Sequence, residues 1–292
     1  MRVAEVVPLV PAWALDRAFS YEVPEGLDVS VGSLVRVPLG GRRVRGVVVA
    51  VSERAEGEEL EAILGSVVAR PLAPPPMPDV LEGLACRYLS PRGVAFGRVV
   101  PPRVRVKPEV VPQRLGVPGI AALDGYTSVE DLARALSAGT GGIWIVQASP
   151  SLDRGLLIGD LVAACRGQAL VCVPEVRWGS PVIRALIERY PEAARLDSAV
   201  DDATRSSGWL AMAAGHHLGV GGRGAVLAPA PELGLIVIED EANIAFKDDR
   251  NPRYEARRVA LERCAASGAA CVFVTSAPSM EVAASVDRGA VL

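Results

Sequence analysis

The sequence predicts two folded parts of different class: a small β-rich N-terminal domain, then an α/β domain with a parallel sheet. Three observations predict this. The length of 292 residues suits roughly two domains. Residues 1–70 contain short β-branched runs separated by turn residues. After residue 127, short apolar runs alternate with segments of helical periodicity, which is typical of a doubly wound sheet covered on both faces.

The N-terminal part is predicted from its strand-like runs and the breaks between them. Strands are expected at 3–10, 33–38 and 46–51. The Gly-Gly pair at 40–41 predicts a hairpin turn with a basic tip. The proline-rich segment 71–78 can continue neither a helix nor a sheet, so it predicts a rigid connector before a short helix at 79–90.

The second part is predicted from alternating helix and strand patterns. Ser128 is a candidate N-cap for a helix that ends near Ala138. Further helices are expected at 156–166, 181–190 and 253–267. Strands are expected at 143–146, 169–173, 224–227, 234–238 and 270–275. The resulting domain bounds are 1–106 for the β-rich domain, 107–127 for a Pro- and Gly-rich linker and 128–292 for the α/β domain.

Composition and charge exclude several classes of protein. With 50% apolar and 22% charged residues and a net charge of −3, the chain is an ordinary globular protein without a global basic field. No uncharged apolar run approaches the roughly 18 residues of a membrane span, and the N-terminus does not resemble a leader. The five cysteines contain no C-x-x-C pair, so we expect no metal site and a reducing, cytoplasmic location.

Two local clusters of basic residues remain. Each is either a solvated surface or a strip that follows phosphates. One cluster is Arg36, Arg42, Arg43 and Arg45; the other is Arg87, Arg92, Arg98, Arg103, Arg105 and Lys107.

Three acids follow a buried strand in the second part. Leu235 to Ile238 is apolar, and Glu239, Asp240 and Glu241 come directly after it. Carboxylates at the carboxyl edge of a parallel sheet are placed to hold the magnesium of a bound nucleotide. The three acids are therefore the candidate metal-binding residues of a nucleotide site.

The phosphate-binding loop that should accompany these acids is missing. Its place, 147–155, has no glycine inside the turn, and Pro150 removes an N–H donor. Asp153 adds a negative charge, which would repel phosphate. The remaining candidates for nucleotide contact are Ser149, Ser151 and Arg154. Neither of the two lysines, at 107 and 247, follows a glycine, so the chain has no intact P-loop elsewhere.

Several segments in colinear order resemble the primosomal protein N′ (PriA) family of replication-restart helicases. In the first domain they are 19–26, 32–38, 46–52, 87–88 and 100–103; in the second they are 170–175, 221–229, 239–242 and 275–279. The resemblance implies the N-terminal DNA-binding domain of that family, followed by its first RecA-like, P-loop NTPase-type lobe. The family uses ATP with magnesium, and zinc held by cysteines that this chain lacks. The phosphate loop is absent, and the acids at 239–241 stand in a different order from those of the family's motif. Both features indicate a helicase-degenerate branch of the family.

In this family the N-terminal domain recognises the 3′ end of the nascent leading strand. Carried over by position, Phe19, Tyr21 and Gly40 remain, whereas the family's aspartate is Ser20 and its lysine is Glu61. Aromatic rings suit a terminal base because stacking tolerates any sequence. The alternative is that both rings pack the small core, which we expect more of Phe19 than of Tyr21. General DNA contact is expected from Arg42, Arg43, Arg45, Arg92, Arg98, Arg103 and Arg105.

The expected function is therefore a replication-restart protein that binds DNA at stalled forks without helicase activity. Its expected partners are forked or single-stranded DNA with a 3′ end and other primosome proteins, in the cytoplasm at the nucleoid, and no cofactor is expected in this chain. Two alternatives stay open. The chain is the N-terminal half of an active ATP-dependent 3′-to-5′ helicase, or it is a primosome scaffold that binds proteins rather than DNA.

Overall fold

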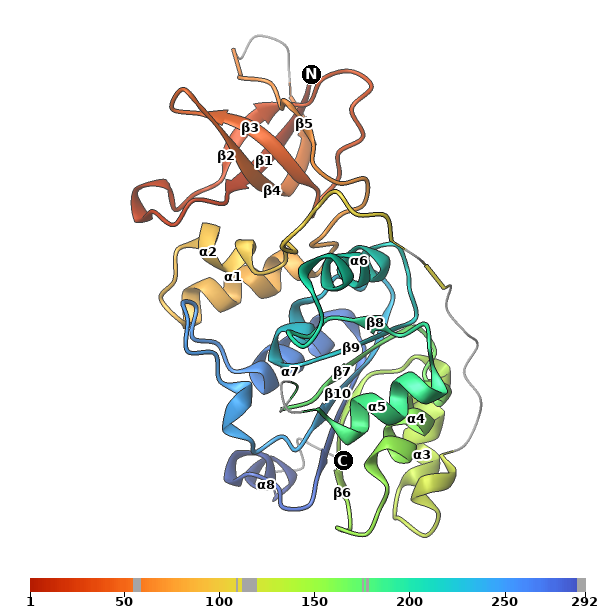
Figure 1. Ribbon diagram of the computed structural model, residues 1–292. Coiled ribbons are helices and arrows are strands. Elements are labelled where there is room, and N and C mark those ends of the chain that lie inside the picture. The colour runs from red at the N-terminus through yellow and green to blue at the C-terminus, as the bar shows by residue number, and fades with distance from the viewer. Residues whose placement is uncertain (55–58, 109, 112–119, 175, 177–178, 288–292) are drawn as a thin grey trace. The chain divides into compact units, whose positions relative to one another are not determined.

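The computed structural model describes residues 1–292 except 55–58, 109, 112–119, 175, 177–178 and 288–292 (Figure 1). The chain divides into two compact units. Unit 1 comprises Met1–Val106 and Asp249–Tyr254, and unit 2 comprises Lys107–Asp248 and Glu255–Leu292. Each unit is built around its own sheet.

Unit 1 contains an antiparallel sheet of five strands in the order β2-β1-β4-β3-β5. The strands are β1 (Arg2–Pro8), β2 (Phe19–Glu22), β3 (Leu34–Leu39), β4 (Arg42–Glu53) and β5 (Gly65–Ser66). The predicted hairpin joins β3 to β4 at Gly40 and Gly41, whose φ angles are 56° and 75°. Only glycine adopts two successive positive φ angles readily, which is why this pair forms the tight turn.

One face of this sheet encloses the core cluster of unit 1. The cluster is formed by valines of β1, β3 and β4 together with Tyr21 and Ile63. A 3₁₀ turn, η1 (Trp13–Leu15), lies between β1 and β2, and the helices α1 (Met77–Arg87) and α2 (Arg92–Gly97) follow the sheet. Gly93 of α2 approaches β1 so closely that a Cβ atom there would lie 2.5 Å from the carbonyl oxygens of Pro8 and Val10.

Unit 2 contains a parallel sheet of six strands in the order β6-β11-β10-β7-β9-β8. The strands are β6 (Gly142–Gln147), β7 (Gln168–Cys172), β8 (Ala194–Arg195), β9 (Leu218–Gly221), β10 (Leu233–Glu239) and β11 (Ala270–Thr275). The helices are α3 (Val129–Ala138), α4 (Arg154–Ala164), α5 (Pro181–Arg189), α6 (Asp202–Ala213), α7 (Ala256–Ser267) and α8 (Met280–Asp287). Short 3₁₀ turns are η2 (Ala121–Leu123), η3 (Arg223–Leu227) and η4 (Ile244–Phe246).

Helices cover the parallel sheet, which explains its almost continuously apolar strands. Leu161 of α4 and Leu186 of α5 pack with Val171, Val237 and Val272 of the central strands, and Figure 1 shows α3, α4 and α5 gathered on one side. The predicted fold class, a β-rich N-terminal domain and an α/β parallel-sheet domain, is confirmed.

A buried amide fixes the start of β7 to its surroundings. Gln168 has no exposed surface. Its Nε2 donates to the carbonyl oxygens of Met212 and His216, at 2.9 and 2.8 Å, and its Oε1 accepts from the amide of Glu232 at 2.9 Å. One side chain therefore satisfies three backbone groups that would otherwise be buried without partners.

Three expectations about unit 2 need correction. The segment 224–227 is not a strand but belongs to the 3₁₀ turn η3, and the strand is β9, immediately before it. Strand β9 was not predicted because it contains two glycines, Gly219 and Gly221. A Cβ atom at either position would lie about 3 Å from Leu196. Ser128 precedes α3 but makes no capping hydrogen bond. Within the segment 107–127, the side chains of Ile120 and Leu123 are buried in the core of unit 2.

Candidate functional site

The three strand-end acids lie at the carboxyl edge of the parallel sheet, as their position after β10 predicts. Glu239 ends β10 and is 9% exposed. Asp240 has a φ angle of 52°, and its amide donates to the carbonyl of Val274 on β11. This left-handed turn sends the three carboxylates in different directions, so each has its own set of partners.

A guanidinium group occupies the space beside Glu239. Arg154, the first residue of α4, donates from Nη1 to Oε1 of Glu239 and from Nη2 to Oγ of Ser276, the latter at 2.6 Å. The pKa of Glu239 is raised by burial, although the hydrogen bond and charge of Arg154 oppose this shift. The positive charge next to the acid is thus supplied by the chain itself.

The N-terminus of α4 is closed by its own carboxylate. Oδ1 of Asp153 accepts the amide of Leu156 at 3.0 Å. The hydroxyl oxygens of Ser149 and Ser151 lie 2.9 Å apart and hydrogen-bond to each other. A helix N-terminus attracts a phosphate through its free N–H groups, and here one of those groups is already bonded to a negative charge.

Glu241 is committed to a second ion-pair network. It has no exposed surface, and it accepts from Nη1 of Arg257 at 2.8 Å and from the amide of Ser279 at 2.5 Å. The guanidinium of Arg257 also donates to Glu255 at 3.0 Å and to Oγ of Ser279 at 2.9 Å. Asp240 accepts from Nδ2 of Asn243 at 3.0 Å. The sequence indicated the acids and the 275–279 loop, but Arg257 carries no local signal and only the fold brings it here.

In unit 1, the two aromatic candidates differ in the opposite sense to that expected. Tyr21 is only 3% exposed and belongs to the core cluster, and its hydroxyl donates to the carbonyl of Pro38 at 2.8 Å. Burial raises the pKa of Tyr21, and the nearby charge of Glu61 raises it further. Phe19 is half-buried, with the guanidinium carbon of Arg17 4.8 Å from its ring centroid. Of the two rings, Phe19 is therefore the more exposed.

Ser20 points away from these rings, because successive residues of a strand face opposite sides. Its hydroxyl donates to Oε1 of Glu5 at 2.7 Å, and Nη2 of Arg54 donates to the same oxygen at 2.9 Å. The structure thus brings Tyr21 and Glu61 together and places the side chain of Ser20 elsewhere.

The arginine candidates fall into two groups. Arg92 forms an ion pair with Glu82, and Arg98 donates to the carbonyl of Asn251 at 2.7 Å, so both have structural roles. The others, together with the turn residue at the hairpin tip, are exposed: Gly40, Arg42, Arg43, Arg45, Arg103 and Arg105.

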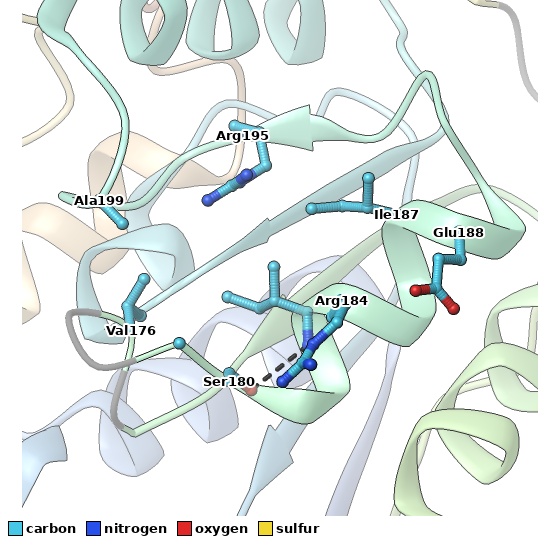
Figure 2. Close-up of a pocket in the computed structure, with 9 residues that line it drawn as sticks. Val176, Ser180, Arg184, Ile187, Glu188, Arg195 and Ala199 are labelled. Carbon is cyan, nitrogen blue, oxygen red and sulfur yellow. Dashed lines mark hydrogen bonds between the residues drawn. The ribbon is translucent and has the colours of Figure 1, made fainter.

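A pocket of about 420 Å³ opens in unit 2 between α5 and β8 (Figure 2). In the lining of this pocket, Arg195 donates hydrogen bonds to both carboxylate oxygens of Asp197, at 2.7 and 3.1 Å. Of the adjoining segment 170–175, Glu175 lies outside the described residues. The pocket is lined by Val176, Gly179, Ser180, Ile183, Arg184, Ile187, Glu188, Arg195 and Ala199.

Neither a metal-ligand cluster nor a membrane-spanning helix occurs among the described residues. Within the described ranges, no three or more histidine, cysteine, aspartate or glutamate side chains are grouped so that they could hold a metal ion. Across the same ranges, no helix combines the length and apolar character needed to cross a bilayer. Cys165, Cys172, Cys264 and Cys271 are buried, whereas Cys86 is exposed.

Fold and site together define a class. The chain joins a small antiparallel β domain to an α/β domain with a six-stranded parallel sheet, at whose carboxyl edge the acids pair with arginines of the same chain.

Comparison with known proteins shows which family the chain resembles. Residues 5–101 match the family model of the 3′DNA-binding domain of PriA. The chain is 26% identical over 294 residues to the replication restart protein PriA of Treponema pallidum, and 25% over 305 residues to that of Rickettsia conorii. It is 29% identical over 300 residues to the probable replication restart protein PriA of Mycobacterium tuberculosis.

These alignments cover 95%, 99% and 94% of this chain and 44%, 45% and 44% of the three relatives. The chain is therefore similar to PriA proteins along nearly its whole length, and it spans less than half the length of these relatives.

Proposed function

We propose that the chain is a replication-restart protein that binds forked or single-stranded DNA through unit 1, and that its α/β domain does not hydrolyse ATP. The observation that carries the proposal is the match of residues 5–101 to a 3′DNA-binding domain. The relatives that match nearly the whole chain are named replication restart proteins, which supports an action at stalled forks together with other restart proteins.

The loss of ATP chemistry is supported by the partners of the candidate catalytic groups. A nucleotide site needs free N–H groups for phosphate and free acids for magnesium and for the attacking water. Here Asp153 caps α4, Arg154 pairs with Glu239, and Arg257 pairs with Glu241. Both ion pairs would have to break before these acids could bind the magnesium of a nucleotide.

DNA binding is tested by fluorescence anisotropy of the whole chain on a labelled fork with a free 3′ end. If about three phosphates are contacted, affinity should fall about 40-fold between ~50 and ~200 mM salt, because each contact releases counterions. Affinity that does not change over this range contradicts the proposal. The absence of any binding would favour the protein-binding scaffold instead.

The helicase alternative is tested by ATP turnover with and without the same fork. We expect no turnover above the buffer rate. DNA-stimulated turnover that disappears in Glu239→Gln or Asp240→Asn would show that the site is active and would overturn this half of the proposal.

A further inference from the structure

Three arginines share one face of the β3–β4 hairpin. Arg36 pairs directly with Arg45 across the two strands, and Arg43 lies two residues from Arg45, opposite Pro38. Side chains at directly opposed positions, and at every second position of a strand, point to the same side. We call Arg36, Arg43 and Arg45 the arginine cluster. Arg42 lies on the other face, since Val44, two residues away, packs against the core cluster.

The neighbours of the arginine cluster leave it open. On one side, Arg36 is paired with Gly65 of β5, which has no side chain. On the other side, the backbone carbonyl of Arg45 accepts the amide of Leu9, an uncharged residue. All three arginines are exposed. Among the described residues, none of the three guanidinium groups has an ion-pair or hydrogen-bond partner.

This arrangement is unfavourable for the isolated domain. Like charges at directly opposed positions of an antiparallel pair repel each other, and each guanidinium lacks the carboxylate that would compensate it. An anion placed between them removes the repulsion and receives hydrogen bonds from both. The arginine cluster is therefore suited to bind a row of anions rather than a single acidic side chain.

We propose that the arginine cluster binds successive phosphates of a DNA backbone. This inference rests on the proposed function and specifies which residues carry it. Arg36 and Arg45 are about 5 Å apart at Cβ, and Arg43 and Arg45 about 7 Å apart along the strand. Phosphates of one DNA strand follow each other with an axial rise of about 3.4 Å. The planar guanidinium fork donates two hydrogen bonds to a phosphate, so each arginine of the cluster can engage one phosphate of the strand.

The first test compares the double variant Arg36→Gln/Arg45→Gln with the wild-type chain on a single strand and on a blunt duplex of equal length. Each lost phosphate contact lowers the slope of log K against log salt by about 0.9 on duplex and 0.7 on a single strand. For two lost contacts we expect the slope to decrease by about 1.8 if the cluster binds duplex, or by about 1.4 if it binds a single strand. A slope and an affinity unchanged on both arms overturn the inference and leave the proposed function standing.

Two controls distinguish an effect of the arginine cluster from an effect of total charge and from misfolding of the variant. Arg70→Gln/Arg134→Gln removes the same charge at exposed sites outside the cluster, and an equal loss of slope there contradicts the assignment. The melting temperature of Arg36→Gln/Arg45→Gln should equal or exceed that of the wild type, because a repulsion is removed. A lower melting temperature would mean that the arginines have structural partners, which also overturns the inference.

The sharpest comparison uses two neighbours in sequence. Arg43→Gln should lower the salt slope by about one phosphate contact, whereas Arg42→Gln, on the opposite face, should change it less. Equal effects of the two substitutions contradict the assignment to one face. A wild-type chain that binds neither arm contradicts the proposed function together with this inference.

Discussion

The guanidinium of Arg154, at the start of α4, forms an ion pair with Glu239, at the end of β10. The two strands that lead to these residues, β6 and β10, are separated by β11, whose following residue Ser276 accepts the second hydrogen bond of the same guanidinium. One side chain therefore ties together the ends of three neighbouring strands.

Breaking this pair from one side should destabilise unit 2. Arg154→Gln leaves Glu239 mostly buried without its cation, and Glu239→Gln leaves Arg154 without its acid. Each substitution should lower the free energy of unfolding by about 2–4 kcal/mol. The double variant should lose less than the sum, with a coupling of about 1–3 kcal/mol in urea titrations. Arg184→Gln, an exposed arginine on α5, is the control and should change the value by under about 0.5 kcal/mol. Strictly additive losses would mean that the pair contributes nothing.

The two aromatic residues of β2 should separate stability from binding. Tyr21→Phe removes the hydrogen bond to Pro38, so unfolding should become about 1 kcal/mol easier while DNA affinity stays the same. Phe19→Leu keeps an apolar side chain but removes the ring, so affinity for single strands should fall by about 1–3 kcal/mol. Melting and anisotropy measured on both variants check this. An affinity loss confined to Tyr21→Phe would contradict the placement of the two rings.

Acid should destabilise unit 2 through His216. Burial, and next the adjacent His217, lower the pKa of His216 from 6.5 to about 4, against the opposing effect of Glu192. The unfolded chain then binds a proton at a higher pH than the folded chain does. Stability is complete above about pH 6.5 and falls toward pH 4, by up to about 3 kcal/mol.

The matched variant for this pH effect is His216→Asn. Its Oδ1 can accept the amide of Val111 as Nδ1 of His216 does at 2.9 Å, but it does not titrate. The difference in free energy of unfolding between the two proteins should narrow from pH 7.5 to pH 4.5. Parallel curves would mean that His216 titrates alike in the folded and unfolded chains.

Removing the amide of Gln168 should be costly, although the replacement is apolar and the site is in the core. Gln168→Leu deprives two carbonyl groups and one amide of their partner, and each buried group left unsatisfied costs about 1–3 kcal/mol. We expect a loss of at least about 3 kcal/mol in urea unfolding. Leu170→Met on the same strand keeps its volume and should cost under about 1.5 kcal/mol. Equal effects of the two substitutions would contradict the role of the amide.

Sequence patterns predicted those parts of the fold whose signal is local. The apolar run before Glu239 specified a buried strand, and the paired glycines at 40–41 specified the hairpin. Strand β9 was missed because its glycines serve close packing against Leu196, and a glycine in a single sequence indicates a turn more readily than a strand. Helix α6 was also not predicted, because its sequence has no apolar stripe at helical spacing.

The site was predicted less completely than the fold, for a different physical reason. The acids could be located because a parallel strand delivers its last residue to one known edge of the sheet. Their partners could not, because Arg257 meets Glu241 only through the packing of α7, and Ser20 meets Glu5 only through the register of β1 with β2. Which cation neutralises which acid is decided by tertiary structure.

The short segment Asp249–Tyr254 has a consequence for how the molecule can come apart. It belongs to unit 1 although both its neighbours in the chain belong to unit 2, and its Asn251 accepts the hydrogen bond of Arg98. The polypeptide therefore passes between the units three times. A protease that cuts once between residues 107 and 127 would leave the two halves held by a loop of the second half that remains folded into the first. Separation would need a further cut on each side of that loop.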